Sequence, residues 1–161
     1  MEFRKLLNII TFPGIIIHEF GHKIFCDLLK VRVEKVCYFR FGEPLGYVIH
    51  ERPKSFHQSL FIVLGPFIVG SLFAIIFYLY SDFYEDIIWK LIFIWLGFSS
   101  AYNCFPSSSD AKILWKETNR HIKKDAFALL GYPFSLIIWL QNKMMWLYLD
   151  VIYAVAVYFF V

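Results

Sequence analysis

The segment Leu60–Tyr80 reads LFIVLGPFIVGSLFAIIFYLY, and none of its 21 residues is charged. As an α-helix this segment would be about 32 Å long, close to the thickness of a bilayer's hydrocarbon core. The whole chain of 161 residues is also strongly apolar, with 59% hydrophobic, 21% aromatic and 18% charged residues. A soluble domain is about 25% charged. This composition excludes an ordinary water-soluble globule and a disordered chain. It predicts a small integral membrane protein with a single domain over residues 1–161.

Three further apolar stretches are long enough to be membrane spans: Leu6–Leu29, Ile87–Phe105 and Pro133–Val161. Polar residues at Gln141–Lys143 interrupt the last stretch, which is either one long tilted helix or two short passes with a hinge there. We favour one helix. We therefore expect an all-α membrane bundle of about four transmembrane helices, a three-helix core plus a C-terminal helix, with five spans as the alternative.

The segment between the first two spans does not have a helical pattern. Val33 and the run Cys37–Phe39 are strand formers, and glycines and a proline follow at residues 42–46. Residues 46–50 then resemble a return strand. We expect a small β-hairpin here, at the membrane surface.

The distribution of charge predicts the orientation of the spans. Residues 30–58 include six Lys or Arg, residues 106–132 include five, and residues 81–86 include none but have three acidic side chains. Because cytoplasmic loops of membrane proteins are enriched in Lys and Arg, we expect the two basic loops in the cytoplasm. Arg4 and Lys5 favour the opposite orientation. The net charge of +3 is dispersed between apolar runs, so we expect a lipid bilayer and no nucleic acid as partner.

The motif that indicates chemistry is His18-Glu19-Phe20-Gly21-His22. On a helix, residues i and i+4 lie on one face, so His18 and His22 can bind one metal ion. Glu19 can then act as the general base that activates a metal-bound water. Ionisable residues within a membrane segment are costly and usually functional. We therefore favour a metal site, with zinc as the expected ion, over a pair of structural histidines.

Such a site needs a third protein ligand, and the expected topology favours Asp110. The first and third spans run in the same direction, so the end of the third span lies at the depth of His18 and His22. Asp27 is nearer in sequence, but at i+5 from His22 it turns away from the histidine face. The three cysteines lack CxxC spacing, and Cys104 is expected to be a small apolar residue rather than a ligand. The other histidines, His50, His57 and His121, are expected in surface roles.

Asn103 and Pro106 mark the end of the third span. A proline ends the regular helix and frees backbone groups, which are tolerated in a membrane only where they face protein or water. The amide of Asn103 could donate to a developing oxyanion. A helix capped by Ser or Asp is expected to follow, over residues 111–120.

With these motifs together, the chain resembles the site-2 protease family of intramembrane zinc metalloproteases. The resemblance rests on His18–His22, on Asn103-Cys104-Phe105-Pro106 followed by Asp110, and on Gly65-Pro66. It covers about residues 13–115, and it departs from the family where Ser108-Ser109-Asp110-Ala111 replaces the typical Leu-Asp-Gly. The resemblance implies cleavage of a transmembrane protein substrate, and the orientation expected from the charge distribution puts the active site towards the cytoplasm. The hairpin could hold an extended substrate by strand addition.

Two other functions are compatible with the same residues. One is a zinc-dependent membrane hydrolase that acts on a lipidated tail or a signal remnant. The other is a non-catalytic membrane protein that binds zinc or a client structurally, although the presence of Glu19 favours an enzyme. A small transporter has little support, because the chain contains no visible inverted repeat.

Overall fold

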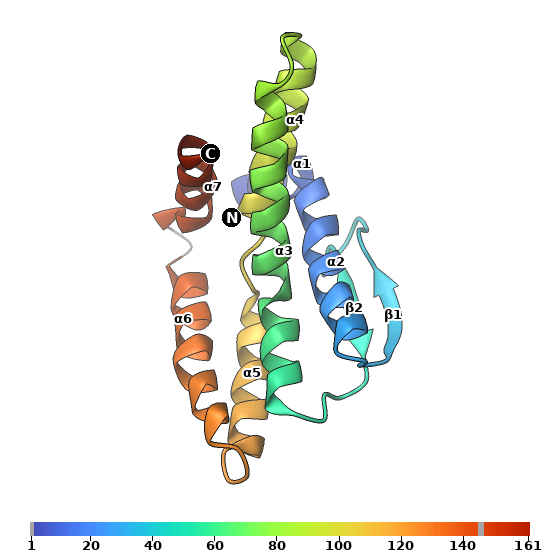
Figure 1. Ribbon diagram of the computed structural model, residues 1–161, viewed down its shortest axis with the longest axis vertical. Coiled ribbons are helices and arrows are strands. Elements are labelled where there is room, and N and C mark those ends of the chain that lie inside the picture. The colour runs from blue at the N-terminus through green and yellow to red at the C-terminus, as the bar shows by residue number, and fades with distance from the viewer. Residues whose placement is uncertain (1, 145–146) are drawn as a thin grey trace.

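The structure is a computed structural model that describes residues 2–144 and 147–161 (Figure 1). It is mostly helical, with one antiparallel two-stranded sheet. In chain order the elements are α1 (Glu2–Ile10), α2 (Phe12–Leu28), β1 (Val33–Cys37), β2 (Tyr47–His50), α3 (Phe56–Asp82), α4 (Ile87–Tyr102), α5 (Ser108–His121), the 3₁₀ helix η1 (Ala126–Leu130), α6 (Gly131–Lys143) and α7 (Leu149–Phe160). The predicted hairpin is confirmed, with Val36 opposite Val48 and Cys37 opposite Tyr47.

Helix α3 is the central element, and α2, α4, α5 and α7 pack against it (Figure 1). Helices α4 and α5 follow one another along one side of α3, and α2 packs against both α3 and α4. One apolar core joins α3 to α5 through the buried side chains of Phe56, Leu60 and Leu114. This core holds the N-terminal end of α5 opposite α2.

Helices α2 and α3 touch through their backbones. A Cβ atom placed on Gly21 would lie 2.7 Å from the Cα of Pro66, and one on Gly65 would lie 2.6 Å from the carbonyl oxygen of Gly21. Glycine is therefore required on both sides, as at close crossings of membrane helices. The helix α3 begins at Phe56, four residues before the uncharged segment Leu60–Tyr80, so Pro66 lies in its interior.

The first predicted span, Leu6–Leu29, is not one continuous helix. The chain turns at Thr11 between α1 and α2. Pro13 lies in the first turn of α2, where it has no N–H to continue the hydrogen-bond ladder of α1. The backbone N–H and the hydroxyl of Thr11 both donate to the carbonyl of Leu7 at 2.8 Å, which closes the last turn of α1.

The expectation of one helix over Pro133–Val161 is also wrong, because α6 ends at Lys143 and α7 begins at Leu149. Near the break, the amide of Asn142 donates to the carbonyls of Ile138 at 2.8 Å and Pro106 at 3.0 Å. Tyr148, just before α7, is left-handed with φ of 52°. The Asn142 side chain thus connects α6 to the segment that follows α4, at the break that the polar residues Gln141–Lys143 had indicated as the alternative.

Among the described residues, α3 is the helix that is both long enough and apolar enough to cross a membrane. Helices α4 and α7 are also apolar but shorter.

Candidate metal centre

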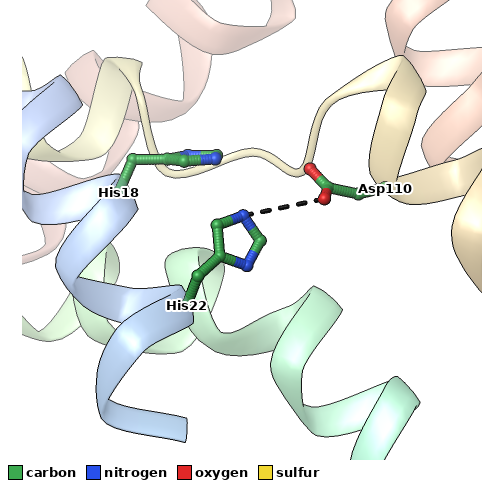
Figure 2. Close-up of side chains that lie close together, drawn as sticks. All are labelled: His18, His22 and Asp110. Carbon is green, nitrogen blue, oxygen red and sulfur yellow. Dashed lines mark ion pairs between the residues drawn. The ribbon is translucent and has the colours of Figure 1, made fainter. Parts of the chain in front are cut away.

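His18, His22 and Asp110 meet at the junction of α2 and α5 (Figure 2). Each offers one ligand atom, and these atoms all lie within 4.8 Å of one another. The Nε2 of His22 is 3.6 Å from the Oδ1 of Asp110. Two ligands of a tetrahedral zinc ion with bonds of about 2.1 Å would be about 3.4 Å apart. The spacing therefore suits two ligands of one zinc ion.

Backbone carbonyls orient both imidazole rings. The Nδ1 of His18 is 2.8 Å from the carbonyl oxygen of Asn103, and the Nδ1 of His22 is 2.8 Å from the carbonyl oxygen of Ile62. A carbonyl oxygen only accepts hydrogen bonds, so Nδ1 carries the proton in each ring. The lone pair of each ring is then on Nε2. This is the arrangement that metal-binding histidines adopt in proteins.

Asp110 is held by the turn that begins α5. The backbone N–H and the hydroxyl of Ser107 both donate to Oδ2 of Asp110 at 2.7 Å. The backbone N–H of Asp110 in turn donates to the Ser107 hydroxyl at 3.3 Å, which completes a capping box. These contacts leave Oδ1 facing His22. The predicted capped helix is confirmed, and its cap also fixes the carboxylate.

Glu19 lies in the wall of a cavity of about 530 Å³ that also includes the three candidate ligands. Its side chain is buried, with 8% of the residue exposed, and within the described chain no hydrogen bond satisfies its carboxylate. It packs on Gly46, where an added Cβ would lie 2.6 Å from the Cγ of Glu19. Because Glu19 lines the cavity, its carboxyl group is in reach of water or a bound molecule there and is a candidate for a chemical role.

Asn103 borders the same cavity, at the end of α4. Its amide donates to the hydroxyl of Thr11 at 2.9 Å and to the carbonyl of Ser99 at 3.0 Å. The side chain thus connects α4 to the α1–α2 junction, while the main-chain carbonyl orients His18. The role of its amide as a donor to an oxyanion stays a prediction.

The residues set aside as ligands lie outside this group. Asp27 forms an ion pair with Lys23 on the exposed side of α2. Cys104 is buried against Gly70, where an added Cβ would lie 2.6 Å from the Cys104 Cβ. His57 lies 3.8 Å from Asp125. None of these residues belongs to the His18–His22–Asp110 group that the described chain brings together.

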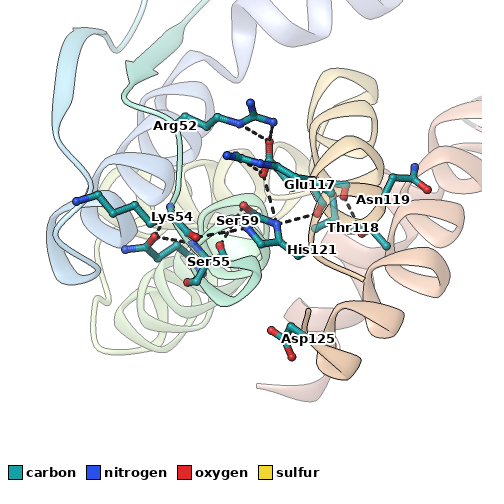
Figure 3. A network of polar contacts seen from close by, with 12 residues as sticks. Arg52, Lys54, Ser55, Ser59, Glu117, Thr118, Asn119, His121 and Asp125 are labelled. Atoms are coloured by element: carbon teal, nitrogen blue, oxygen red, sulfur yellow. Dashed lines mark hydrogen bonds and ion pairs between the residues drawn. The ribbon is translucent and has the colours of Figure 1, made fainter. Parts of the chain in front are cut away.

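A second polar network fixes α5 to the segment that follows β2 (Figure 3). Arg52 donates through Nε at 2.9 Å and Nη2 at 2.7 Å to one carboxylate oxygen of Glu117, which is buried. His121 lies one turn further along α5. Its Nδ1 is 3.6 Å from the other carboxylate oxygen of Glu117, and its Nε2 is 3.4 Å from the carbonyl oxygen of Lys54. This network ties the hairpin's return segment to the helix that carries Asp110.

Sequence reasoning missed three contributors: the carbonyl of Ile62, the cap residue Ser107 and the close contact at Gly46. The pattern Ser-x-x-Asp at Ser107–Asp110 is a capping-box signature that could have identified the second. The carbonyl of Ile62 precedes Pro66 by one helical turn, which is also visible in the sequence. The contact of Gly46 with Glu19 is tertiary, and no local pattern indicates it.

The comparisons with known proteins add no relative. No protein-family model, no curated protein and no solved structure matches this chain.

Proposed function

We propose that this protein is a zinc-dependent intramembrane endopeptidase. The observation that carries the proposal is the convergence of His18, His22 and Asp110, whose ligand atoms lie within 4.8 Å of one another, in a cavity that Glu19 also lines. The combination of two imidazole nitrogens and one carboxylate oxygen with a fourth position free is typical of catalytic zinc sites. A structural zinc site is usually closed by four protein ligands, so this donor set favours catalysis.

In the proposed reaction the zinc ion and the side chains of the protein have different roles. A zinc ion bound by the three ligands would supply Lewis acidity to the scissile carbonyl and to the attacking water. Glu19 would accept the proton of that water and deliver it to the leaving amine. Its carboxylate is free of hydrogen bonds within the described chain and adjoins His18 along α2, so it is available for both steps. The Asn103 amide now donates to the Thr11 hydroxyl. By donating instead to the oxyanion of the substrate, it would stabilise the developing negative charge.

The proposed setting is a lipid bilayer that the chain crosses more than once. Large apolar side chains of α3 and α4 point away from the protein, with 54% of Leu72, 64% of Ile88 and 56% of Leu91 exposed. Exposure on this scale suits contact with lipid better than contact with water. The basic loops 30–58 and 106–132 support a cytoplasmic position for the active site, by the positive-inside rule.

The proposed substrate is a transmembrane protein with a locally extended segment. Gly46, Tyr47 and Val48, at the start of β2, line the cavity beside Glu19, and β1 occupies one edge of β2. An extended peptide could add to the other edge by main-chain hydrogen bonds. Deletion of residues 34–49 should then abolish cleavage with zinc still bound, and retention of both would refute this role.

The test compares the wild-type protein with Glu19→Gln, both purified in detergent and loaded with zinc. Each is incubated with a pooled library of single-span apolar peptides, and cleavage sites are mapped by mass spectrometry. We expect products from the wild type only, sensitive to a metal chelator, with equal zinc content in the two proteins. Equal cleavage by Glu19→Gln would contradict the assigned base. A zinc-loaded wild type that yields no product would favour a non-catalytic zinc protein or a different substrate class.

A further inference from the structure

The helical hydrogen-bond ladder of α3 has a gap opposite the candidate metal centre. In an α-helix the carbonyl of residue i accepts from the N–H of residue i+4, so the regular donor to Ile62 would be residue 66. Residue 66 is proline, which has no N–H. The ring of an interior proline also pushes the carbonyl one turn earlier away from the helix axis. Pro66 therefore leaves the carbonyl of Ile62 without its regular donor and turned outward.

The freed carbonyl is the one that His22 uses. The Nδ1 of His22 is 2.8 Å from the Ile62 oxygen, and both residues are buried. A buried carbonyl without a donor is costly. The N–H of the His22 ring supplies the donor that the Ile62 carbonyl lacks. Gly21, the residue before His22, makes the contact possible, because a Cβ there would collide with the backbone of Pro66.

We propose that Pro66 is a positioning residue of the metal centre. By withholding a backbone N–H from Ile62 it reserves that carbonyl for His22, keeps the proton of His22 on Nδ1 and points the Nε2 lone pair at Asp110. The inference rests on the proposed function for the identity of the metal, whereas the ring's tautomer can be measured in the protein without metal.

The same logic applies independently to His18. Its carbonyl acceptor, Asn103, is the residue at the C-terminal end of α4. The N–H four residues later belongs to Ser107, and it donates to Asp110 and not to Asn103. Both ligand histidines therefore take carbonyls released by interruptions of helices, one at a proline within α3 and one at the end of α4.

The decisive variant is Pro66→Ala, which restores the N–H of residue 66 and is compatible with a helix, since alanine is the best helix former. The matched control is Pro133→Ala, which removes an exposed proline from α6 outside the cavity. Metal-free proteins labelled with ¹⁵N-histidine are compared by NMR in micelles, with His22→Ala to assign the resonances. We expect a single Nδ1–H tautomer of His22 in the wild type and in Pro133→Ala, and a mixture of tautomers in Pro66→Ala.

Zinc alone is then titrated against a chromophoric chelator. Pro66→Ala should bind zinc about 10–100-fold more weakly than the wild type, the usual loss when an outer hydrogen bond to a ligand is removed, while its metal-free form unfolds at the same or a higher temperature. An unchanged His22 tautomer, or zinc affinity within about twofold of wild type, would overturn the role of Pro66. Failure of the wild type itself to bind zinc would overturn the proposed function, and the tautomer comparison would still decide whether Pro66 orients His22.

Discussion

Ser107→Ala should weaken zinc binding by a larger factor than its effect on folding explains. The Ser107 hydroxyl makes two contacts in the cap of α5, one to Oδ2 of Asp110 and one from the Asp110 N–H. Loss of a serine cap costs about 0.5–2 kcal/mol of stability. The backbone N–H of residue 107 still donates to Oδ2, so the carboxylate keeps one of its two supports. Removal of a hydrogen bond to a metal ligand usually lowers metal affinity by about 10–100-fold. We therefore expect the lower end of this range, about a tenfold loss of zinc affinity.

The chain contains a matched control for this prediction. Ser55 caps α3 with the same type of box, in which its hydroxyl accepts from the N–H of Gln58 at 3.4 Å, and it does not line the cavity. Ser55→Ala should lose a similar amount of stability and keep its zinc affinity. Thermal unfolding followed by circular dichroism and zinc titration against a chelator measure the two effects separately. Equal zinc affinities in Ser107→Ala and Ser55→Ala would refute the reasoning that the cap orients Asp110.

Two further changes test other parts of the site, and a third tests the backbone after α2. Glu19→Gln should reduce peptide cleavage by about 10²–10⁴-fold without loss of zinc, and a chelator assay with product mapping checks both. Gly46→Ala should displace the Glu19 side chain, since the new Cβ would lie 2.6 Å from its Cγ, and lower turnover by about 100-fold at unchanged zinc content; normal turnover would contradict the placement of Glu19. Lys30, exposed after the end of α2, has φ of 57°, so Lys30→Gly should raise stability by roughly 1 kcal/mol, and an unchanged or lower melting temperature would show that no strain is relieved.

The helices and the hairpin could be predicted because their signals are local. Apolar runs marked α3 and α4, strand formers and turn residues marked the hairpin, and the Ser- and Asp-containing segment before residue 111 marked α5 as a capped helix. The motif His18–His22 was predictable for the same reason, since a helix places residues four apart on one face. Asp110 required only the relative direction of two helices, which the order of the apolar stretches and the charge distribution indicated.

The break between α1 and α2 could not be predicted from the apolar pattern alone, and the break after α6 was indicated only as an alternative, by the polar residues Gln141–Lys143. At both breaks a side chain bonds to a backbone carbonyl of another segment: the Asn103 amide donates to the Thr11 carbonyl and the Asn142 amide to the Pro106 carbonyl. The orientation of His22 likewise depends on a carbonyl of α3, 40 residues away in sequence. These contacts are tertiary, and a sequence shows only that Pro66 leaves a carbonyl available.

The central claim is that His18, His22 and Asp110 bind a zinc ion. The most direct measurement is the metal content of the detergent-purified protein beside its His22→Ala variant, by elemental analysis of folded samples. The account predicts about one zinc per chain in the wild type and loss of zinc in the variant. A folded wild type without zinc, or a variant that keeps it, would contradict the account and leave His18 and His22 as structural polar residues.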